Sequence, residues 1–176
     1  VPGSAIVYVR DRKKTKEISD FLLKNNITSD FFHAGLTNSK KDRKQENWKK
    51  GICRVIVATN AFGMGIDKSD VRLVVHVDLP DSLEAYFQEA GRAGRDEQKA
   101  YAVLLYSKAD NGKLKKRISN NFPEKDKIIR VYEALGNYFQ LAVGHGLGMI
   151  YDFNLAEFCS AFKFGMLPAF SSLKIL

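Results

Sequence analysis

Short runs of β-branched residues alternate with segments of helical periodicity along the first part of the chain, and this alternation restricts the fold more than any other feature. Strands are predicted at 5–9, 54–58, 72–77 and 101–106, with a weaker strand at 30–32. Strands that alternate with helices in this way form a parallel sheet with helices on both faces. We therefore expect an α/β domain.

Two helices are expected between the first three strands. The first begins after Thr15 and has apolar residues at helical spacing, namely Ile18, Phe21 and Leu22. The second, at 39–50, is polar apart from its one large apolar anchor, Trp48, and Gly51 is well placed to end it. Trp48 is therefore the expected contact of this helix with the core.

A third helix is expected after Pro80, where Asp81 and Glu84 are spaced as a capping box. Its apolar stripe consists of Leu83, Tyr86 and Phe87. A stripe of this kind is typical of a helix that packs on one face.

The segment directly after this helix, Gln88–Asp96, reads Gln-Glu-Ala-Gly-Arg-Ala-Gly-Arg-Asp. Arg92 and Arg95 are three residues apart and can point the same way from one helical turn or tight bend. Arginine binds phosphate oxygens through two parallel hydrogen bonds and stays charged when water is removed. Glycine at 91 and 94 lets the backbone approach a ligand closely. The segment is a candidate phosphate site, with a surface ion-pair turn as the alternative.

A second polar segment, Ala58–Asp67, follows the strand at 54–58. Ligands of open α/β sheets bind outside the carboxyl ends of the strands, so this loop lies where a site is expected. Thr59 could bond a phosphate and Asp67 a ribose hydroxyl. The glycines of the loop could equally shape a turn between strand and helix. The two readings stay open at this point.

Taken in order, these segments resemble the second RecA-like domain of superfamily-two helicases. The matching motifs are Tyr8–Arg12 (motif IV), His33–Leu36 (the short segment after it), Ala58–Asp67 (motif V) and Gln88–Asp96 (motif VI). Motifs V and VI together look like those of RecQ DNA helicases. DEAD-box RNA helicases usually place a histidine where Gln88 stands, whereas the DEAH group of RNA helicases also has the glutamine and both arginines. A DEAH-type RNA helicase therefore remains an alternative.

The resemblance implies a role for each matching residue. Arg92 and Arg95 would reach the ATP γ-phosphate across a cleft, with Arg95 as the arginine finger that stabilises the transferred phosphoryl group. Gln88 would couple the nucleotide to motif V, while Gly65 and Asp67 would lie at the ATP, Asp67 near its ribose. Contacts with the nucleic-acid backbone would come from Thr59, Asn60, Arg12 and His33. From its own position, His33 could also be a packed or capping residue.

The half of a helicase site that grips phosphate is missing from these 176 residues, because neither Gly-x-x-x-x-Gly-Lys-Ser/Thr nor Asp-Glu-x-His occurs in them. We expect ATP with Mg²⁺ to be held mostly by an N-terminal RecA-like domain of the parent protein, and this fragment alone to be inactive. The resemblance implies an ATP-dependent DNA helicase of repair and recombination. It would move 3′ to 5′ on single-stranded or forked DNA.

A mainly helical appendage at 111–176 is expected to follow the RecA-like domain at 1–110. One long amphipathic helix runs through 128–139, and another starts after a cap formed by Asn154 and Glu157. RecQ proteins commonly continue into a four-cysteine zinc module, yet Cys159 is the one cysteine in the corresponding region, so zinc or another metal is not expected. Packing would instead involve Tyr132, Leu135, Phe139, Phe158 and Phe162.

The formal net charge of +8 is concentrated in two segments: 40–50 has six basic and two acidic residues, and 108–130 has eight basic and three acidic ones. This pattern fits a polyanionic partner or a solvated face. Two distant cysteines, no leader and no apolar run of membrane length indicate a cytoplasmic setting, at the nucleoid if bacterial, with no membrane partner. A non-catalytic nucleic-acid-binding module is the alternative from another class, and the intact pair Arg92 and Arg95 argues against it.

Overall fold

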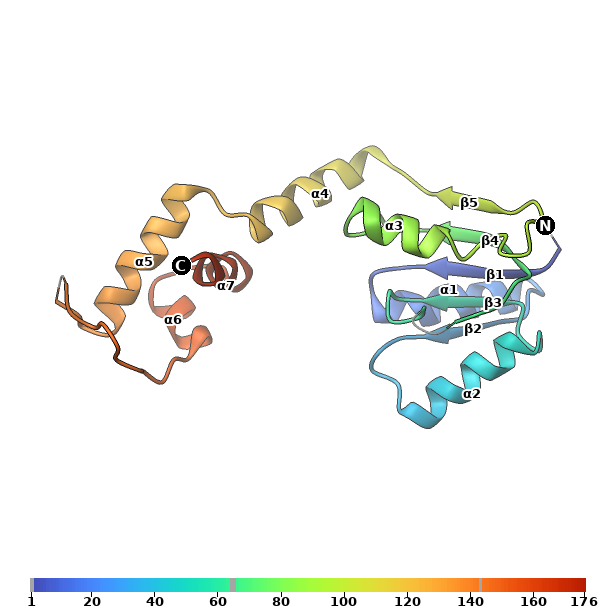
Figure 1. Cartoon of the computed structure of the whole chain (residues 1–176), viewed down its shortest axis with the longest axis horizontal. Helices are drawn as coiled ribbons and strands as arrows, with labels where there is room; N and C mark the ends of the chain where they lie inside the picture. Colours follow the sequence, from blue (N-terminus) through green and yellow to red (C-terminus); the bar gives the residue numbers. More distant parts are fainter. Residues whose placement is uncertain (1, 64–65, 143) are drawn as a thin grey trace. The chain divides into compact units, whose positions relative to one another are not determined.

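The computed structural model describes residues 2–63, 66–142 and 144–176 (Figure 1). It divides into two compact units, Val1–Asp110 and Asn111–Leu176. The first unit carries a sheet, and the second is helical. Every motif named above belongs to the first unit.

A five-stranded parallel sheet with strand order β2-β3-β1-β4-β5 forms the first unit. Its strands are β1 (Ser4–Tyr8), β2 (Ser29–Phe32), β3 (Val55–Ala58), β4 (Val71–His76) and β5 (Tyr101–Leu104). All five expected strands are present, and the predicted α/β class is confirmed. The carboxyl ends of the strands meet at one edge, because the strands are parallel.

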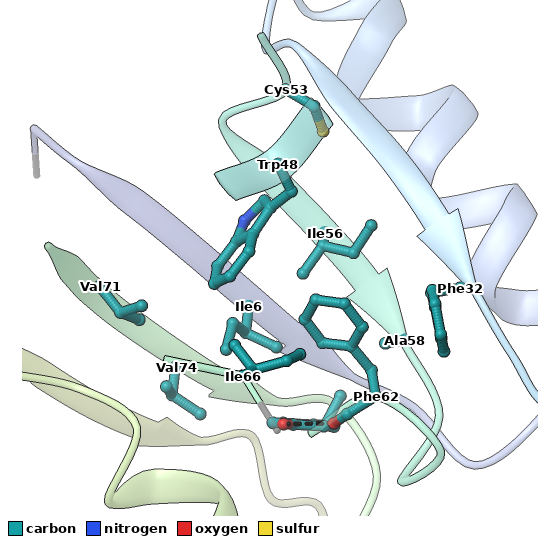
Figure 2. Packing of buried hydrophobic residues seen from close by; sticks show 11 residues of the cluster. Ile6, Phe32, Trp48, Cys53, Ile56, Ala58, Phe62, Ile66, Val71 and Val74 are labelled. Carbon is teal, nitrogen blue, oxygen red and sulfur yellow. Dashed lines mark hydrogen bonds between the residues drawn. The ribbon is translucent and has the colours of Figure 1, made fainter. Parts of the chain in front are cut away.

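Successive side chains of β1 point to opposite faces of the sheet and build two cores. Ile6 and Tyr8 belong to a core that contains Trp48 of α2 (Asn38–Lys49), which Figure 2 shows from close by. On the other face, Ala5 and Val7 pack with side chains of α1 (Arg12–Lys24). Helices therefore cover both faces, as predicted.

Trp48 ties the polar helix α2 to the sheet. Its side chain has no exposed surface, and its indole Nε1 donates to the main-chain oxygen of Ala5 at 3.2 Å. The ring meets that of Phe62 edge-on, with 5.4 Å between centroids. The expected anchor is confirmed, and it also holds Phe62 in the loop that follows β3.

The helix α3 (Leu83–Ala90) departs from prediction at its cap and its stripe. Ser82, not Asp81, is the N-cap, and its Oγ accepts from the amide of Ala85 at 3.2 Å. Leu83 and Phe87 are 74% and 68% exposed. They share one side of the helix, whereas Tyr86 and Glu89 lie on the side that meets β4. The predicted packing stripe is therefore wrong for Leu83 and Phe87, and Tyr86 alone of its residues packs on β4. Phe21 of α1 is exposed as well.

Beyond β5, the described residues form four helices: α4 (Lys108–Asn121), α5 (Lys125–Tyr138), α6 (Leu155–Ala161) and α7 (Met166–Ile175). As expected, Asn154 caps α6, since its Oδ1 accepts from the amides of Ala156 at 3.0 Å and Glu157 at 3.3 Å. The sequence patterns missed α4 and α7.

The core of the second unit forms between α5, α6 and α7. It contains Val131, Ala134, Phe158, Cys159 and Ala169, with Leu135 and Phe162 packed against it. Tyr132 was expected in this core, but it is 66% exposed. It follows Val131 directly and is therefore turned about 100° away around the helix axis. Phe139 instead stacks on Tyr151, with 4.7 Å between ring centroids.

Candidate functional site

The segment Gln88–Asp96, here called the arginine segment, turns Arg92 inward. Its Nη1 donates to the main-chain oxygen of Gly63 at 2.6 Å. Its Nε is buried and has no hydrogen-bond partner in the described part of the chain. A Cβ at position 63 would lie 2.2 Å from Arg92 Nη2, so glycine permits this approach. Arg92 thereby joins motif VI to motif V.

Tyr8, at the end of β1, completes this junction. Its hydroxyl donates to the main-chain oxygen of Phe62 at 3.0 Å and also contacts the guanidinium of Arg92. Burial raises the pKa of Tyr8 to about 12, although the nearby Arg92 charge acts in the opposite direction. The phenol therefore stays protonated, and it remains a donor at neutral pH.

Arg95 lies on the other side of the segment and points toward solvent. Its Nη1 donates to the main-chain oxygen of Ile66 at 3.0 Å and to Oδ1 of Asp67 at 3.1 Å. The Arg95 side chain is 38% exposed and that of Asp67 is 91% exposed. Gln88 is exposed too. Both arginines thus meet the motif V loop, while the predicted nucleotide contact Gly65 lies outside the described residues.

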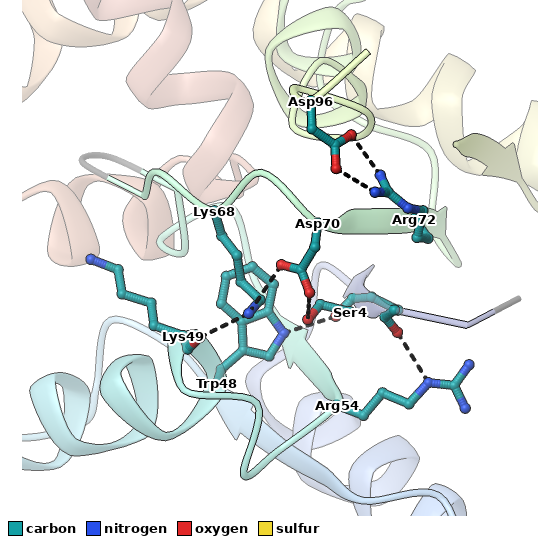
Figure 3. A network of polar contacts seen from close by, with 10 residues as sticks. Ser4, Trp48, Lys49, Arg54, Lys68, Asp70, Arg72 and Asp96 are labelled. Carbon is teal, nitrogen blue, oxygen red and sulfur yellow. Dashed lines mark hydrogen bonds and ion pairs between the residues drawn. The ribbon is translucent and has the colours of Figure 1, made fainter. Parts of the chain in front are cut away.

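Two pairs hold the arginine segment to β4. The Nε2 atom of His76, which is 1% exposed, lies 2.9 Å from Oε2 of Glu89. At the other end of the strand, Arg72 forms a two-pronged ion pair with Asp96 (Figure 3). The hydrogen bonds from Arg72 hold the pKa of Asp96 down at about 2.

Sequence reasoning assigned no role to these four anchoring residues. Glu89 and Asp96 stand inside motif VI, where the resemblance gave roles to Gln88, Arg92 and Arg95. His76 stands inside the strand predicted at 72–77 and belongs to no motif. Arg72 and His76 flank the buried Val74 on one face of β4, and two polar residues on the same face of an otherwise apolar strand were the available signal that this face meets polar groups.

The remaining predicted residues gather at the carboxyl edge of the sheet. Arg12, His33 and Thr59 follow β1, β2 and β3, whose ends are neighbours because the strand order is β2-β3-β1. Thr59 is buried, whereas Asn60 is exposed and lines a cleft of about 140 Å³ with Tyr8, Arg10 and His76. This edge therefore presents polar groups from three loops.

Arg12 and His33 lie together beside Gly35. A Cβ at Gly35 would be 3.1 Å from Nη1 of Arg12 and 3.3 Å from Nδ1 of His33. The two side chains line a groove with Lys13, Lys16, Glu17, Asp20 and Phe31. Burial lowers the pKa of His33, and the charges of Arg12, Lys44 and Lys41 lower it further. With His33 neutral, three basic and two acidic side chains line the groove, which leaves a small positive excess that includes Arg12.

No group of three or more His, Cys, Asp or Glu side chains that could hold a metal occurs in residues 2–63, 66–142 and 144–176. Within the same ranges, no helix is long and apolar enough to cross a membrane.

Comparison with known proteins identifies related sequences. Residues 1–97 match the family model of the helicase conserved C-terminal domain. The ATP-dependent DNA helicase RecQ of Pasteurella multocida is 48% identical over 107 residues, which cover 61% of this chain and 17% of that protein. A putative ATP-dependent RNA helicase of Acanthamoeba polyphaga mimivirus is 39% identical over 140 residues, covering 78% of this chain and 26% of that protein. The chain thus spans about a quarter or less of these relatives.

Among solved structures, the E. coli DEAD-box protein SrmB bound to regulator of ribonuclease activity A is similar, with a TM-score of 0.57 and 29% identity. The match covers 65% of this chain and 69% of that one. The yeast DEAD-box protein Dbp5, in its C-terminal domain structure, gives a TM-score of 0.56 at 25% identity, over 70% of this chain and 72% of that one. The sheet with its flanking helices is therefore the RecA-like arrangement of helicase C-terminal domains.

Proposed function

This chain belongs to the helicase conserved C-terminal domain family, as a domain of the RecQ type, and we propose that it is the second motor domain of an ATP-dependent DNA helicase. In this proposal it supplies Arg95 to an ATP site shared with an N-terminal RecA-like domain. It also grips single-stranded DNA along the carboxyl edge of its sheet.

The observation that carries the proposal is the outward position of Arg95. Within the described residues, Nη1 of Arg95 donates both hydrogen bonds of this side chain, to the main-chain oxygen of Ile66 and to Asp67, whereas Nε and Nη2 donate none. A partly exposed guanidinium with two free donor groups fits a phosphate oxygen pair. Its partner Asp67 is largely exposed, so the resting ion pair is weak and can be exchanged for phosphate.

Arg92 has a different part in the proposed site. It was expected to reach the nucleotide beside Arg95, but its guanidinium is bound to Gly63 and Tyr8. Reaching a phosphate would break the 2.6 Å hydrogen bond to Gly63. In the resting domain Arg92 therefore connects the arginine segment to the motif V loop, and a contact with ATP would require the loop to shift.

The proposed mechanism follows from these positions. Bound ATP with Mg²⁺, held mostly by the N-terminal domain, supplies the phosphoryl group that is transferred to water. Arg95 stabilises the charge that develops on this group, an effect of about a thousandfold or more in rate. Gln88 and Asp67 contact the nucleotide, Asp67 at the ribose. Without the N-terminal domain, the fragment is expected to be inactive.

The nucleic-acid grip is proposed for the carboxyl edge. Arg12 and His33 would bind backbone phosphates in their groove, where three basic side chains accompany Glu17 and Asp20. Thr59 and Asn60 would contact the backbone from the end of β3; Asn60 is exposed, whereas the buried Thr59 would do so only if the loop moves. Contacts with phosphates carry no sequence information, so they suit a motor that moves along any strand. Movement 3′ to 5′ and a cellular location at the DNA are part of the same proposal.

The second unit would occupy the place of the RecQ zinc module. Its aromatic core around Phe158 would take over the scaffold role without metal, since Cys159 is buried in that core. The boundary at 110/111 is then also the functional boundary between motor domain and appendage.

An RNA helicase is the second candidate, because the mimivirus relative is named as one and both similar structures are DEAD-box proteins. ATPase activity of the full-length parent protein with single-stranded DNA, single-stranded RNA or neither distinguishes the two. The proposal expects stimulation by DNA well above that by RNA. RNA-selective stimulation would favour the second candidate, and no turnover with either strand would favour a non-catalytic binding module.

A further inference from the structure

The arginine segment is fastened to β4 at both of its ends. Glu89 pairs with His76, the last residue of the strand, and Asp96 pairs with Arg72, its second residue. Arg72 and His76 are four residues apart and therefore point to the same face of the sheet. The segment spans the strand from its carboxyl end to its amino end, with Arg95 between the two anchors.

The anchor at Asp96 is the more specific of the two. Arg72 donates from Nη1 to Oδ1 of Asp96 at 2.8 Å and from Nη2 to Oδ2, an arrangement visible in Figure 3. The same carboxylate accepts from the amide of Gln98 at 3.1 Å. Nearby, the amide of Gly94 donates to the main-chain oxygen of Val71 at 3.0 Å. The backbone on either side of Arg95 is therefore held.

We propose that Arg72 and Asp96 are positioning residues for Arg95, acting through the main chain and without touching nucleotide. This inference rests on the proposed function of Arg95. Asp96 follows Arg95 directly, so their Cα atoms are about 3.8 Å apart and any shift of Asp96 moves the finger. A two-pronged pair fixes both distance and orientation, which a lysine in place of Arg72 cannot do.

A role in positioning can be told apart from a contribution to stability. The side chains are 17% and 27% exposed, so the pair contributes to folding as well, and kcat must be compared among variants that are folded. Misplacement of a catalytic group by about 1 Å can lower a rate by about a hundredfold. Substitutions of Arg72 or Asp96 leave the buried core intact, whereas a substitution of His76, which pairs with Glu89, would alter a buried side chain.

The test uses the full-length parent protein and its nucleic-acid-stimulated ATPase. We expect Arg72→Gln and Asp96→Asn to lower kcat about tenfold or more, with KM for ATP changed little, because the loss falls on the transition state. Arg72→Lys should behave like Arg72→Gln. The exchange of both residues, Arg72→Asp with Asp96→Arg, should recover part of kcat. Lys50→Gln, which removes the exposed pair with Glu46, is the matched control and should leave kcat unchanged.

A double-mutant cycle with Arg95→Lys separates positioning from general loosening. If Arg72 acts through Arg95, Arg72→Gln should cost far less in the Arg95→Lys background than in the wild type. Equal losses in both backgrounds, or an unchanged kcat in Arg72→Gln, would overturn the inference while leaving the role of Arg95 intact. Full activity of Arg95→Ala would instead overturn the proposed function, and with it this inference. Far-UV circular dichroism and urea unfolding of each full-length variant confirm that it is folded.

Discussion

Arg95 and Asp67 form an ion pair between motif VI and motif V, with 3.1 Å between Nη1 and Oδ1. The two residues are far apart in the sequence, and the pair joins the segment after α3 to the loop after β3. It occupies one nitrogen of the guanidinium and an almost fully exposed carboxylate. The pair thus holds Arg95, the proposed arginine finger, through a weak contact that a phosphate can replace.

Asp67→Asn should weaken the binding of ATP and have little effect on the free energy of unfolding. The exposed pair is worth no more than about 1 kcal/mol, so we expect the free energy of unfolding to change by less than that. Loss of the proposed ribose contact should raise KM for ATP several-fold while kcat changes little, since this contact is the same in ground and transition states. ATPase kinetics of the parent protein check this. A large fall in kcat at unchanged KM would contradict the assignment of Asp67 to the ribose.

Gly63→Ala should disturb the junction around Arg92. The added Cβ would lie 2.2 Å from Nη2 and 2.6 Å from Cζ of Arg92, so that side chain must move. The main-chain oxygen of Gly63 then loses its partner, at a cost of about 1–3 kcal/mol in unfolding free energy. Urea unfolding followed by Trp48, the one tryptophan of the chain, measures the effect on the first unit.

The same substitution at Gly112 is the control for this prediction. Gly112 lies in α4 with open space around it. Gly112→Ala should therefore stabilise its helix by about 0.5–1 kcal/mol and leave the Trp48 transition where it is. A Gly63→Ala protein with wild-type stability and ATPase would show that Arg92 has room to adjust.

The pair of Asp96 with Arg72 predicts a defined dependence of stability on acid. Its folded pKa of about 2 lies below the ordinary 3.8, so the contribution is fully present above about 4 and is lost as pH falls through 2. Asp96→Asn should therefore be less stable than the wild type above that window, with the difference shrinking inside it. Urea midpoints at a series of pH values test this. A difference that stays constant down to the acid limit would mean that the carboxylate is not held by Arg72.

The proposed contact between Arg12 and a backbone phosphate predicts a salt effect. Arg12→Ala should weaken binding of the parent protein to single-stranded DNA equally for different sequences, because the proposed contact is with phosphate. The slope of log K against log salt should fall by about one for each phosphate contact removed. Titrations at several salt concentrations measure it. Sequence-dependent weakening, or an unchanged slope, would place Arg12 away from the backbone.

The sequence predicted the sheet better than it predicted the surroundings of the arginines. Apolar runs such as Ile6–Val9 identify buried strands, because two covered faces require continuous apolar residues. The side of α3 that meets β4 could not be predicted in the same way, since Tyr86 and Glu89 face inward while Leu83 does not. That choice depends on His76, a partner that is near only in the folded chain.

The same limit applies to Arg92 and Arg95. Their spacing suggested that both point one way, yet one binds Gly63 and the other Ile66 and Asp67. The glycines of the segment permit this divergence, because Gly94 adopts a φ of +69° between the two arginines. The motif identified both arginines, but only the tertiary contacts distinguish the inward Arg92 from the outward Arg95.

The central claim is that Arg95 is the arginine finger of a DNA-stimulated ATPase. The most direct measurement is kcat of the full-length parent protein with saturating single-stranded DNA, for the wild type, Arg95→Ala and Arg95→Lys. We predict a fall of about a thousandfold or more for Arg95→Ala, with little recovery by lysine, and with DNA affinity and the urea unfolding midpoint unchanged. Turnover within a few-fold of the wild type in a folded Arg95→Ala protein would contradict the claim.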